Sequence, residues 1–424
     1  MSSAAGSSNA ASTIRGGGGV ALAVLVMNVT TYGFTIACAH ILGPTDYGAL
    51  AAWMNVLLVV NVGFLGLQAT AARRLSSGEH SLDEVEPHLV RLTLVTSVVL
   101  GAVLLALTPL IDVTLQLDDW LMAALLGASV IPLTITGGLT GILQGERRWG
   151  ALSAVYICIG APRLVLGVAL TAWRPEPRWA ALSVAVALLA PVAVALYALR
   201  HRPLRAGARS REAGLGSLLR EMVHNSQALL AFFALSNVDL IVARHTLDSQ
   251  DAGLYAAGLI LAKAVLFLPQ FVSIVAFPSM AADDSSRTFI AAVLSVVGLG
   301  ALATLATAVL PGLALIFVGG SDYDDVRGRL WIFAVLGTLL ALLMMVVYGL
   351  IARGGTRAVY LTWLALVAII GFGLTVSTVS GMLTVVIVVD AVLVVVLLVA
   401  HQRTSVVPSR EPTSVDSYPA GWDH

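Results

Sequence analysis

Long apolar segments recur along the whole chain, and they restrict the fold more than any other feature of its 424 residues. Each is close to the about 20 mainly apolar residues that a helix needs to cross a bilayer. Only 11% of the residues are charged, against about 25% in soluble domains, so the polar helix faces of a water-soluble fold are missing. The sequence therefore predicts an all-α polytopic membrane protein with twelve spans, at 18–41, 47–71, 89–111, 119–143, 149–173, 179–199, 222–245, 252–281, 288–318, 329–352, 358–377 and 380–400.

The basic residues between these spans are sorted by side. With both termini in the cytoplasm, the segments on that side hold 17 arginines and the opposite side holds 5. Cytoplasmic loops carry such an excess, so we expect a multi-pass protein of the cytoplasmic membrane with both termini inside. The arginine-rich segment 200–221 fits a topology-fixing loop on anionic lipid better than a site for an acidic partner. Residues 1–17 and 401–424 are small, polar or charged, and we expect them to be disordered.

The two halves of the chain share an internal repeat. The stretch "ILGPTDYGALAAW", which begins at Ile41, aligns with "TLDSQDAGLYAAG", which begins at Thr246, at an offset of 205 residues. The offset places Gly48 on Gly253. It predicts two six-helix bundles of the same orientation, 18–199 and 222–400, joined by the basic linker 200–221. Parallel repeats of this kind build alternating-access transporters, whose substrate site lies in a central cavity between the halves.

The only lysine of the chain, Lys263, stands in one of the most apolar segments. The repeat aligns it with Leu58, so the lysine is a departure from the framework. It lies eleven residues into its span, at a depth of roughly 16 Å. A charge at that depth needs a partner or a wet cavity. Two alternatives stay open, since Lys263 can line a cavity or pair with Asp239 of the preceding span.

Other polar side chains within spans are weaker candidates. Arg163 is near mid-span beside Pro162, and Asp390 lies midway along the last span. Amides and hydroxyls in spans are more often interhelical hydrogen-bonding groups than cavity lining. With that alternative open, the candidate cavity amides are Asn28, Asn61, Gln68, Asn225, Asn237 and Gln270. Cys38 and Cys158 fit small apolar packing residues. We find no catalytic motif and no metal or phosphate-cradling pattern, so the sequence predicts no enzyme activity, cofactor or bound metal.

Several motifs carry a resemblance to a known family. "ILGPTDYGALAAW", "GILQGERRWGALSAVYICIGAPRLVLGVAL", "SNVDLIVARHTLDSQDAGLYAAGLILAKAVLFLPQFVSIVAFPSMA" and "YGLIARGGTR" follow one another between about residues 40 and 360. Together they resemble the polysaccharide-export branch of the multidrug/oligosaccharidyl-lipid/polysaccharide flippase superfamily. The resemblance includes an arginine in the fifth span, here Arg163, and an Asn-x-Asp in the seventh, here Asn237 and Asp239. With twelve spans, the chain lacks the extra pair that lipid II flippases of the superfamily carry.

The resemblance implies a function. It implies a transporter that moves a polyprenyl-diphosphate-linked oligosaccharide from the inner to the outer leaflet for cell-surface polysaccharide synthesis. Arg163 and Lys263 would then meet the diphosphate, since arginine grips phosphate bidentately and lysine acts as a point charge. Asp239 would balance the cavity charge or couple transport to an ion, Na+ or H+. The expected partners are the lipid-linked glycan, membrane lipids and glycan-synthesis machinery, and nucleic acid is not among them.

Two rival functions remain. A cation-coupled multidrug exporter of the same fold would favour an excess of acid in its cavity, whereas the spans hold two cations, Arg163 and Lys263, against two acids, Asp239 and Asp390. A membrane-embedded glycosyltransferase or polymerase would usually need a long outer loop or an acidic outer-loop motif. The expected outer loops are mostly about ten residues or fewer, which disfavours such an enzyme.

Overall fold

The computed structural model describes residues 3–76, 82–200, 215–280, 286–352 and 356–404, and every regular element in these ranges is helical. Within these ranges, ten helices are long and apolar enough to cross a membrane. The first of them, Gly18–Leu75, is bent and holds two spans, and the shorter apolar helix Ala358–Gly373 adds one more. The expected twelve-span all-α architecture is confirmed.

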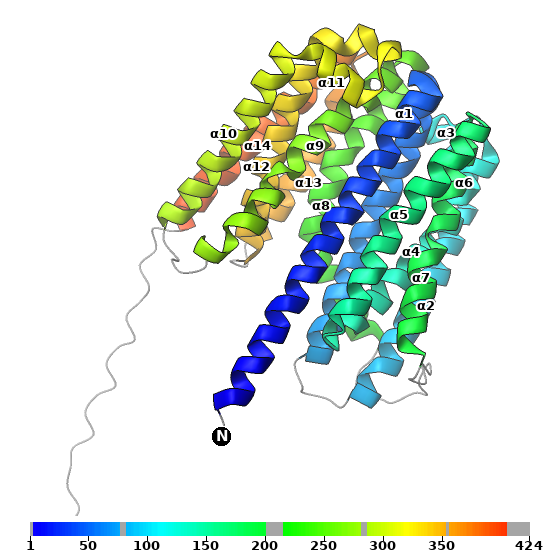
Figure 1. The fold of residues 1–424 in the computed structure, drawn as a ribbon. Helices are drawn as coiled ribbons and strands as arrows, with labels where there is room; N and C mark the ends of the chain where they lie inside the picture. The colour runs from blue at the N-terminus through cyan, green and yellow to red at the C-terminus, as the bar shows by residue number, and fades with distance from the viewer. Residues whose placement is uncertain (1–2, 77–81, 201–214, 281–285, 353–355, 405–424) are drawn as a thin grey trace, which may run out of the picture.

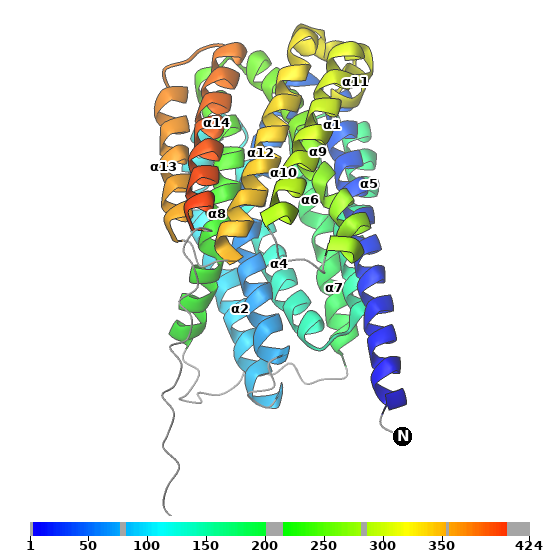
Figure 2. The ribbon, with the colours of Figure 1, turned by 90° about the vertical axis from the view of Figure 1, so that its left-hand side faces the viewer.

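The helices form two lobes that lie side by side (Figure 1). The N-lobe contains α1 (Ser3–Ser76), α2 (Leu82–Ala106), α3 (Thr108–Leu115), α4 (Trp120–Gly145), α5 (Trp149–Trp173), α6 (Pro177–Ala187) and α7 (Leu189–Leu199). The C-lobe contains α8 (Leu215–Thr246), α9 (Ser249–Met280), α10 (Ser286–Val309), α11 (Pro311–Val318), the 3-10 helix η1 (Ser321–Arg329), α12 (Leu330–Ala352), α13 (Thr356–Gly373) and α14 (Val379–Thr404). The start of α1 and the start of α8 lie at one end of the molecule, and α11 lies at the other (Figure 2).

The termini differ in detail from the expectation. Helix α1 begins at Ser3, although we expected no regular structure in residues 1–17. Helix α8 begins at Leu215, seven residues before the expected span 222–245. The expected disordered tail 401–424 is helical as far as Thr404, and its remainder lies outside the described residues, as does most of the linker 200–221.

Breaks in the helices fall at backbone positions that the sequence explains. Gly43 bends α1 between its two spans, with φ of 72° and ψ of 175°, a conformation that side chains with a Cβ disfavour. The third and ninth expected spans are each divided, at Leu107 and at Leu310, one or two residues before Pro109 and Pro311. Proline fits the first turn of a helix and not its interior, because its ring blocks the preceding turn. The third span of each lobe is therefore broken, whereas the sixth expected span is divided at Leu188 and its counterpart α14 is continuous.

Close helix packing holds the N-lobe together. The glycines at positions 137, 141 and 145 of α4 face the second span of α1. A Cβ on Gly137 would lie 2.8 Å from Phe64 Cβ, and one on Gly145 would lie 2.6 Å from Leu75 Cβ. Small residues at this spacing let two helices approach without a hydrophobic driving force, as membrane packing requires.

The larger buried apolar cluster is shared between the lobes. The larger apolar cluster contains Phe34 and Trp53 of the N-lobe together with Tyr255 and Tyr323 of the C-lobe. A second cluster includes Leu67, Leu75, Leu89, Leu139, Leu143 and Leu199, all in the N-lobe. The lobes are thus fused through side chains at the end that carries α11, where burial of apolar surface favours their contact.

Candidate functional site

The Lys263 ammonium of α9 joins the two lobes. Its Nζ lies 2.6 Å from Oδ1 of Asn55 in the second span of α1, and 2.8 Å from Oδ1 of Asn237 in α8. No carboxylate oxygen of the described residues is within 4.0 Å of it. The expected alternative of a direct ion pair with Asp239 is therefore not what the structure shows. We call these three residues, Lys263, Asn55 and Asn237, the lysine bridge.

The two amides of the bridge are held differently. Asn237 is 1% exposed, and its Nδ2 donates to the carbonyl oxygen of Phe233 at 2.7 Å and to Ser236 Oγ at 3.1 Å. Those bonds fix its oxygen toward the ammonium. Asn55 is 5% exposed, and its Nδ2 has no hydrogen-bond partner in the described part of the chain. A buried donor left without a partner costs about 1–3 kcal/mol, so the bridge holds an unused donor beside a cation that contacts no described carboxylate.

Two buried acids lie together within the C-lobe. Asp239 accepts hydrogen bonds from the Tyr255 hydroxyl and from the Leu240 backbone N–H, each at 2.8 Å. Asp390 of α14 is 1% exposed, and neither of its carboxyl oxygens has a partner among the described residues. Asp239 is the charged neighbour whose field acts on Asp390. We call Asp239 and Asp390 the acid pair. Within the described ranges, no three His, Cys, Asp or Glu side chains gather as a metal cluster would.

Arg163 lies apart from the lysine bridge, in the N-lobe. Its guanidinium carbon is 4.8 Å from the centroid of the Phe34 ring, which fits a cation–π contact. Its Nε is buried and has no hydrogen-bond partner in the described ranges. The repeat offset of 205 relates Phe34 to Asp239. The repeat therefore aligns the aromatic ring that contacts Arg163 in the N-lobe with an acidic residue, Asp239, in the C-lobe.

The remaining predicted residues divide into three groups. Gln68 donates from Nε2 to Gln144 Oε1 at 2.9 Å and to the Tyr156 hydroxyl at 3.0 Å, so it serves interhelical hydrogen bonding. Asn28 and Asn61 are partly buried, and no hydrogen bond of their side chains is found among the described residues. The side chains of Asn225 and Gln270 lie outside the described residues.

Sequence reasoning missed two members of these clusters. Asn55 is a single amide in the apolar run that begins the second span, and it was passed over in favour of Asn61 and Gln68. Tyr255 was read as part of the repeat and not as a partner for an acid. For Asn55, its isolation among apolar neighbours was the available signal.

The lobes also meet at the end that carries α11, which we call the closed end. Thr45 Oγ1 donates to Gln250 Oε1 at 3.3 Å, and the two residues are 205 positions apart. The Tyr323 hydroxyl donates to the carbonyl oxygen of Ala39 at 2.9 Å. A Cβ placed on Gly48 would lie 2.9 Å from the Gly253 Cα, again at the repeat offset. Residues related by the repeat therefore contact each other, as residues do around a two-fold axis.

Arg244 links the two lobes at the closed end. The side chain is 3% exposed, and its Nε donates to the carbonyl oxygen of Leu115 at 3.1 Å. Its Nη2 donates to the carbonyl oxygen of Gln116, the residue that ends α3 in a left-handed conformation. The last carbonyl groups of a helix lack intrahelical partners and carry partial negative charge. A C-lobe cation therefore caps an N-lobe helix.

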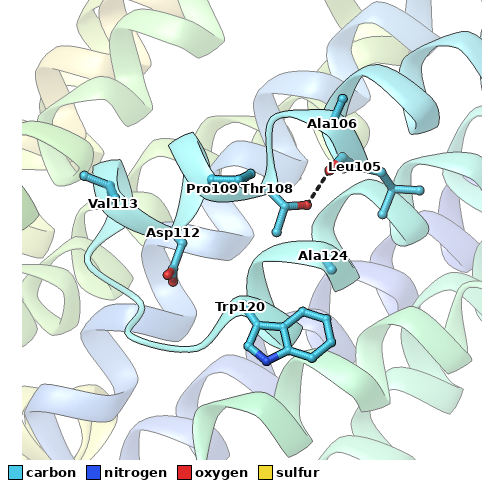
Figure 3. Close-up of a pocket in the computed structure, with 8 residues that line it drawn as sticks. All are labelled: Leu105, Ala106, Thr108, Pro109, Asp112, Val113, Trp120 and Ala124. Carbon is cyan, nitrogen blue, oxygen red and sulfur yellow. Dashed lines mark hydrogen bonds between the residues drawn. The ribbon is translucent and has the colours of Figure 1, made fainter.

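A separate pocket of about 730 Å³ lies between α2, α3 and the start of α4. Trp120 and Asp112 are among its lining residues, and Thr108 is turned back to the carbonyl oxygen of Leu105 at 2.7 Å (Figure 3). None of the residues of the lysine bridge or the acid pair lines it.

The comparisons with known proteins agree on family and fold. The family described as "Polysaccharide biosynthesis protein" matches residues 14–282. No curated protein matches the chain. Among solved structures, the inward-facing conformation of a multidrug resistance MATE family transporter of the MOP superfamily has a TM-score of 0.70 at 15% identity, covering 90% of this chain and 94% of that one.

Two further structures show the same fold. The outward-facing conformation of a multidrug resistance MATE family transporter has a TM-score of 0.58 at 16% identity, covering 90% of this chain and 95% of that one. A MOP superfamily transporter from Pyrococcus furiosus has a TM-score of 0.60 at 16% identity, covering 91% and 95%. The chain belongs to the polysaccharide biosynthesis protein family, and it shares the fold of MOP superfamily transporters.

Proposed function

We propose that this protein flips a polyprenyl-diphosphate-linked oligosaccharide from the inner to the outer leaflet of the cytoplasmic membrane. The observation that carries the proposal is the lysine bridge, a partly buried cation between the lobes that two neutral amide oxygens hold and that no described carboxylate contacts within 4.0 Å. A cation in that state is stabilised further by an anion. The diphosphate headgroup of the proposed cargo would supply such an anion.

Arg163 supplies a second cation for the same cargo. Its buried Nε has no partner in the described residues, and the flat guanidinium rests on Phe34. Arginine presents a rigid fork of donors that matches phosphate oxygens. The two cations lie in different lobes, so in this proposal the headgroup contacts the N-lobe through Arg163 and the C-lobe through Lys263.

The acid pair is the proposed coupling site. Asp390 is buried without a hydrogen-bonding or ionic partner in the described part of the chain, and Asp239 lies near enough to act on it electrostatically. Two neighbouring buried carboxylates repel each other. Either one of them takes up a proton, or a bound cation offsets their charge. A proton or Na+ taken up there would alter the packing of α8 against α14. An ion gradient could in this way drive a conformational change in the lobe that holds Lys263.

The proposed orientation puts the closed end on the outer side. The distribution of arginines places the termini inside, and the N-terminus of α1 lies away from the closed end (Figure 2). The higher TM-score with the inward-facing structure, 0.70 against 0.58 for the outward-facing one, supports the same assignment. The cargo would then enter from the inner leaflet, where glycan-synthesis enzymes assemble it, and leave outward for the enzymes that extend it.

A second candidate is a cation-coupled multidrug exporter, and the acid pair is the observation that favours it. A cationic drug would suit Asp239 and Asp390 better than it would suit Lys263. However, the MOP fold does not set the polarity of its site, since the Pyrococcus furiosus transporter is described as having a binding pocket of reverse polarity. We favour the flippase because Lys263, which has no direct ion pair within the described residues, lies between the lobes, whereas the acids lie within one lobe.

Deletion of the gene, followed by analysis of lipid-linked sugars, tests the proposal. We expect a defined polyprenyl-diphosphate glycan to accumulate on the inner leaflet, and its composition identifies the cargo. Restoration by the native gene and not by a Lys263→Ala gene ties the effect to the bridge. Unchanged lipids together with new sensitivity to cationic drugs would establish the exporter instead.

A further inference from the structure

The lysine bridge and the closed end lie on the same two helices. On α1, Asn55 comes seven residues after Gly48, and on α9, Lys263 comes ten residues after Gly253. At about 1.5 Å per residue, the bridge is roughly 10–15 Å from the glycine contact. Among the described side chains, the Lys263–Asn55 hydrogen bond is therefore the next polar link between these helices below the closed end.

We propose that this bond is the switch by which occupation of the site releases the closed end. The inference rests on the proposed function, and it adds Asn55 as a substrate-sensing residue. An anionic diphosphate takes the ammonium away from the Asn55 oxygen, and α1 and α9 lose the polar link that joins them at mid-depth.

The chemistry of the bridge favours the exchange. An ammonium has three donor hydrogens, and in the described structure two of them are used by amide oxygens without charge. A hydrogen bond from an ammonium to an ionised oxygen is roughly twice as strong as a neutral one, so a diphosphate competes well for the lysine. Asn55 is the partner that yields, because no bond fixes its Nδ2 in the described residues, whereas Asn237 is anchored to Phe233.

The exchange also gives the Nδ2 donor of Asn55 a hydrogen-bond partner. Once its oxygen is free, the unpartnered Nδ2 can donate to an anionic oxygen. The headgroup then receives one donor from each lobe, Asn55 from α1 and Lys263 from α9, with a new spacing between them. A ligand shifts a conformational equilibrium only through contacts that differ between the two states, and this bond differs, because it is present without the ligand and absent with it.

The test follows the closed end directly in the full-length protein, reconstituted in liposomes. Thr45→Cys and Gln250→Cys are combined with Cys38→Ala and Cys158→Ala, and a short bifunctional thiol reagent measures how often the two positions are close. The probe is farnesyl diphosphate, with inorganic pyrophosphate as the arm that separates a lipid headgroup from the free anion. Binding of each probe is measured separately by calorimetry.

Three variants test whether the Asn55 side chain controls the closed end. In the protein with native Asn55, we expect farnesyl diphosphate to lower crosslinking about fivefold, the change that loss of one hydrogen bond produces. Asn55→Ala should have low crosslinking without ligand and little further response. Asn55→Asp should keep high crosslinking with ligand, because a carboxylate holds the ammonium. Gly63→Ala, on the same span, is the matched control, because a Cβ there meets nothing within 4 Å, and it should behave as the native protein does.

The outcomes separate the two proposals. If Asn55→Ala crosslinks and responds to farnesyl diphosphate as Gly63→Ala does, the switch is wrong even though the cargo proposal stands. If neither diphosphate binds the protein with native Asn55, the proposed cargo is wrong, and the ligand-free crosslinking of Asn55→Ala still decides whether the bridge holds the closed end. A response to pyrophosphate equal to that to farnesyl diphosphate would assign the switch to the free anion.

Discussion

Gly48 and Gly253, which the internal repeat aligns, pack directly against each other where the two lobes meet. A Cβ on Gly48 would lie 2.9 Å from the Gly253 Cα, and one on Gly253 would lie 1.9 Å from the carbonyl oxygen of Pro44. Neither obstacle is the end of a flexible side chain, so only glycine allows the two helices to come this close. The closed end therefore depends on two residues without side chains that the repeat places opposite each other.

Gly253→Ala should weaken the closed end. The added methyl group meets backbone, and an overpacked contact of this kind costs about 1–3 kcal/mol, which is roughly a 5- to 150-fold shift away from the closed arrangement. Thiol crosslinking between Thr45→Cys and Gln250→Cys measures the shift. Gly63→Ala is the matched control, because a Cβ there meets nothing within 4 Å. Equal crosslinking in both variants would show that the glycine contact does not govern closure.

Arg244→Ala should loosen α3. The substitution removes the donors to the carbonyl oxygens of Leu115 and Gln116, and loss of a partner by a buried acceptor costs about 1–3 kcal/mol. Hydrogen exchange of the amides in residues 108–117 should then be about 5- to 150-fold faster.

The control for that measurement is Arg178→Ala. Arg178 forms its ion pair with Glu176 on the surface, where both side chains are partly exposed. Such pairs contribute about 0–1 kcal/mol, so exchange in α3 should stay at the native rate. Native exchange in Arg244→Ala would mean that the cap does not hold α3.

Asp390→Asn should uncouple transport from the ion gradient while leaving the fold intact. The amide has nearly the same size, and no hydrogen bond of the carboxyl is lost within the described structure. Replacing an unpaired buried charge by a neutral group is neutral or stabilising. In proteoliposomes, an imposed proton or sodium gradient should accelerate transport by the native protein and not by Asp390→Asn. The exposed Asp322→Asn serves as control, and a native gradient response in Asp390→Asn would remove the acid pair from coupling.

The sequence predicts the architecture well, because its spans are set by local composition. Runs of apolar residues, the arginine distribution and the repeat require no knowledge of contacts between helices. The exceptions are local backbone events. The sequence does not show that α1 continues as one helix through the Gly43 bend, or that the spans near Pro109 and Pro311 divide in two.

The candidate site is less predictable, because its partners are set by packing between distant helices. Lys263 stands out by charge alone, but its contact with Asn55 joins residues 208 positions apart. The repeat gives no help there, since it pairs Asn55 with Ile260. Pairing with Asp239 was one of two open alternatives for Lys263, and in the structure Asp239 accepts a hydrogen bond from the Tyr255 hydroxyl. A search for opposite charges overlooks a cation that neutral amides hold.

Flipping of a labelled lipid in proteoliposomes tests the central claim most directly. The cargo is a short polyprenyl-diphosphate disaccharide with a fluorophore on the sugar, and a membrane-impermeant reductant bleaches only the outer leaflet. With the native protein, we predict that the bleached fraction of the fluorophore exceeds the fraction that lies in the outer leaflet at the start and approaches the total. With Lys263→Ala it should stop at the level of protein-free liposomes, with Lys263→Arg it should be partial, and with the surface control Arg174→Ala it should match the native protein. Native protein that bleaches no more than protein-free liposomes, or Lys263→Ala that bleaches as fully as the native protein, would contradict the account.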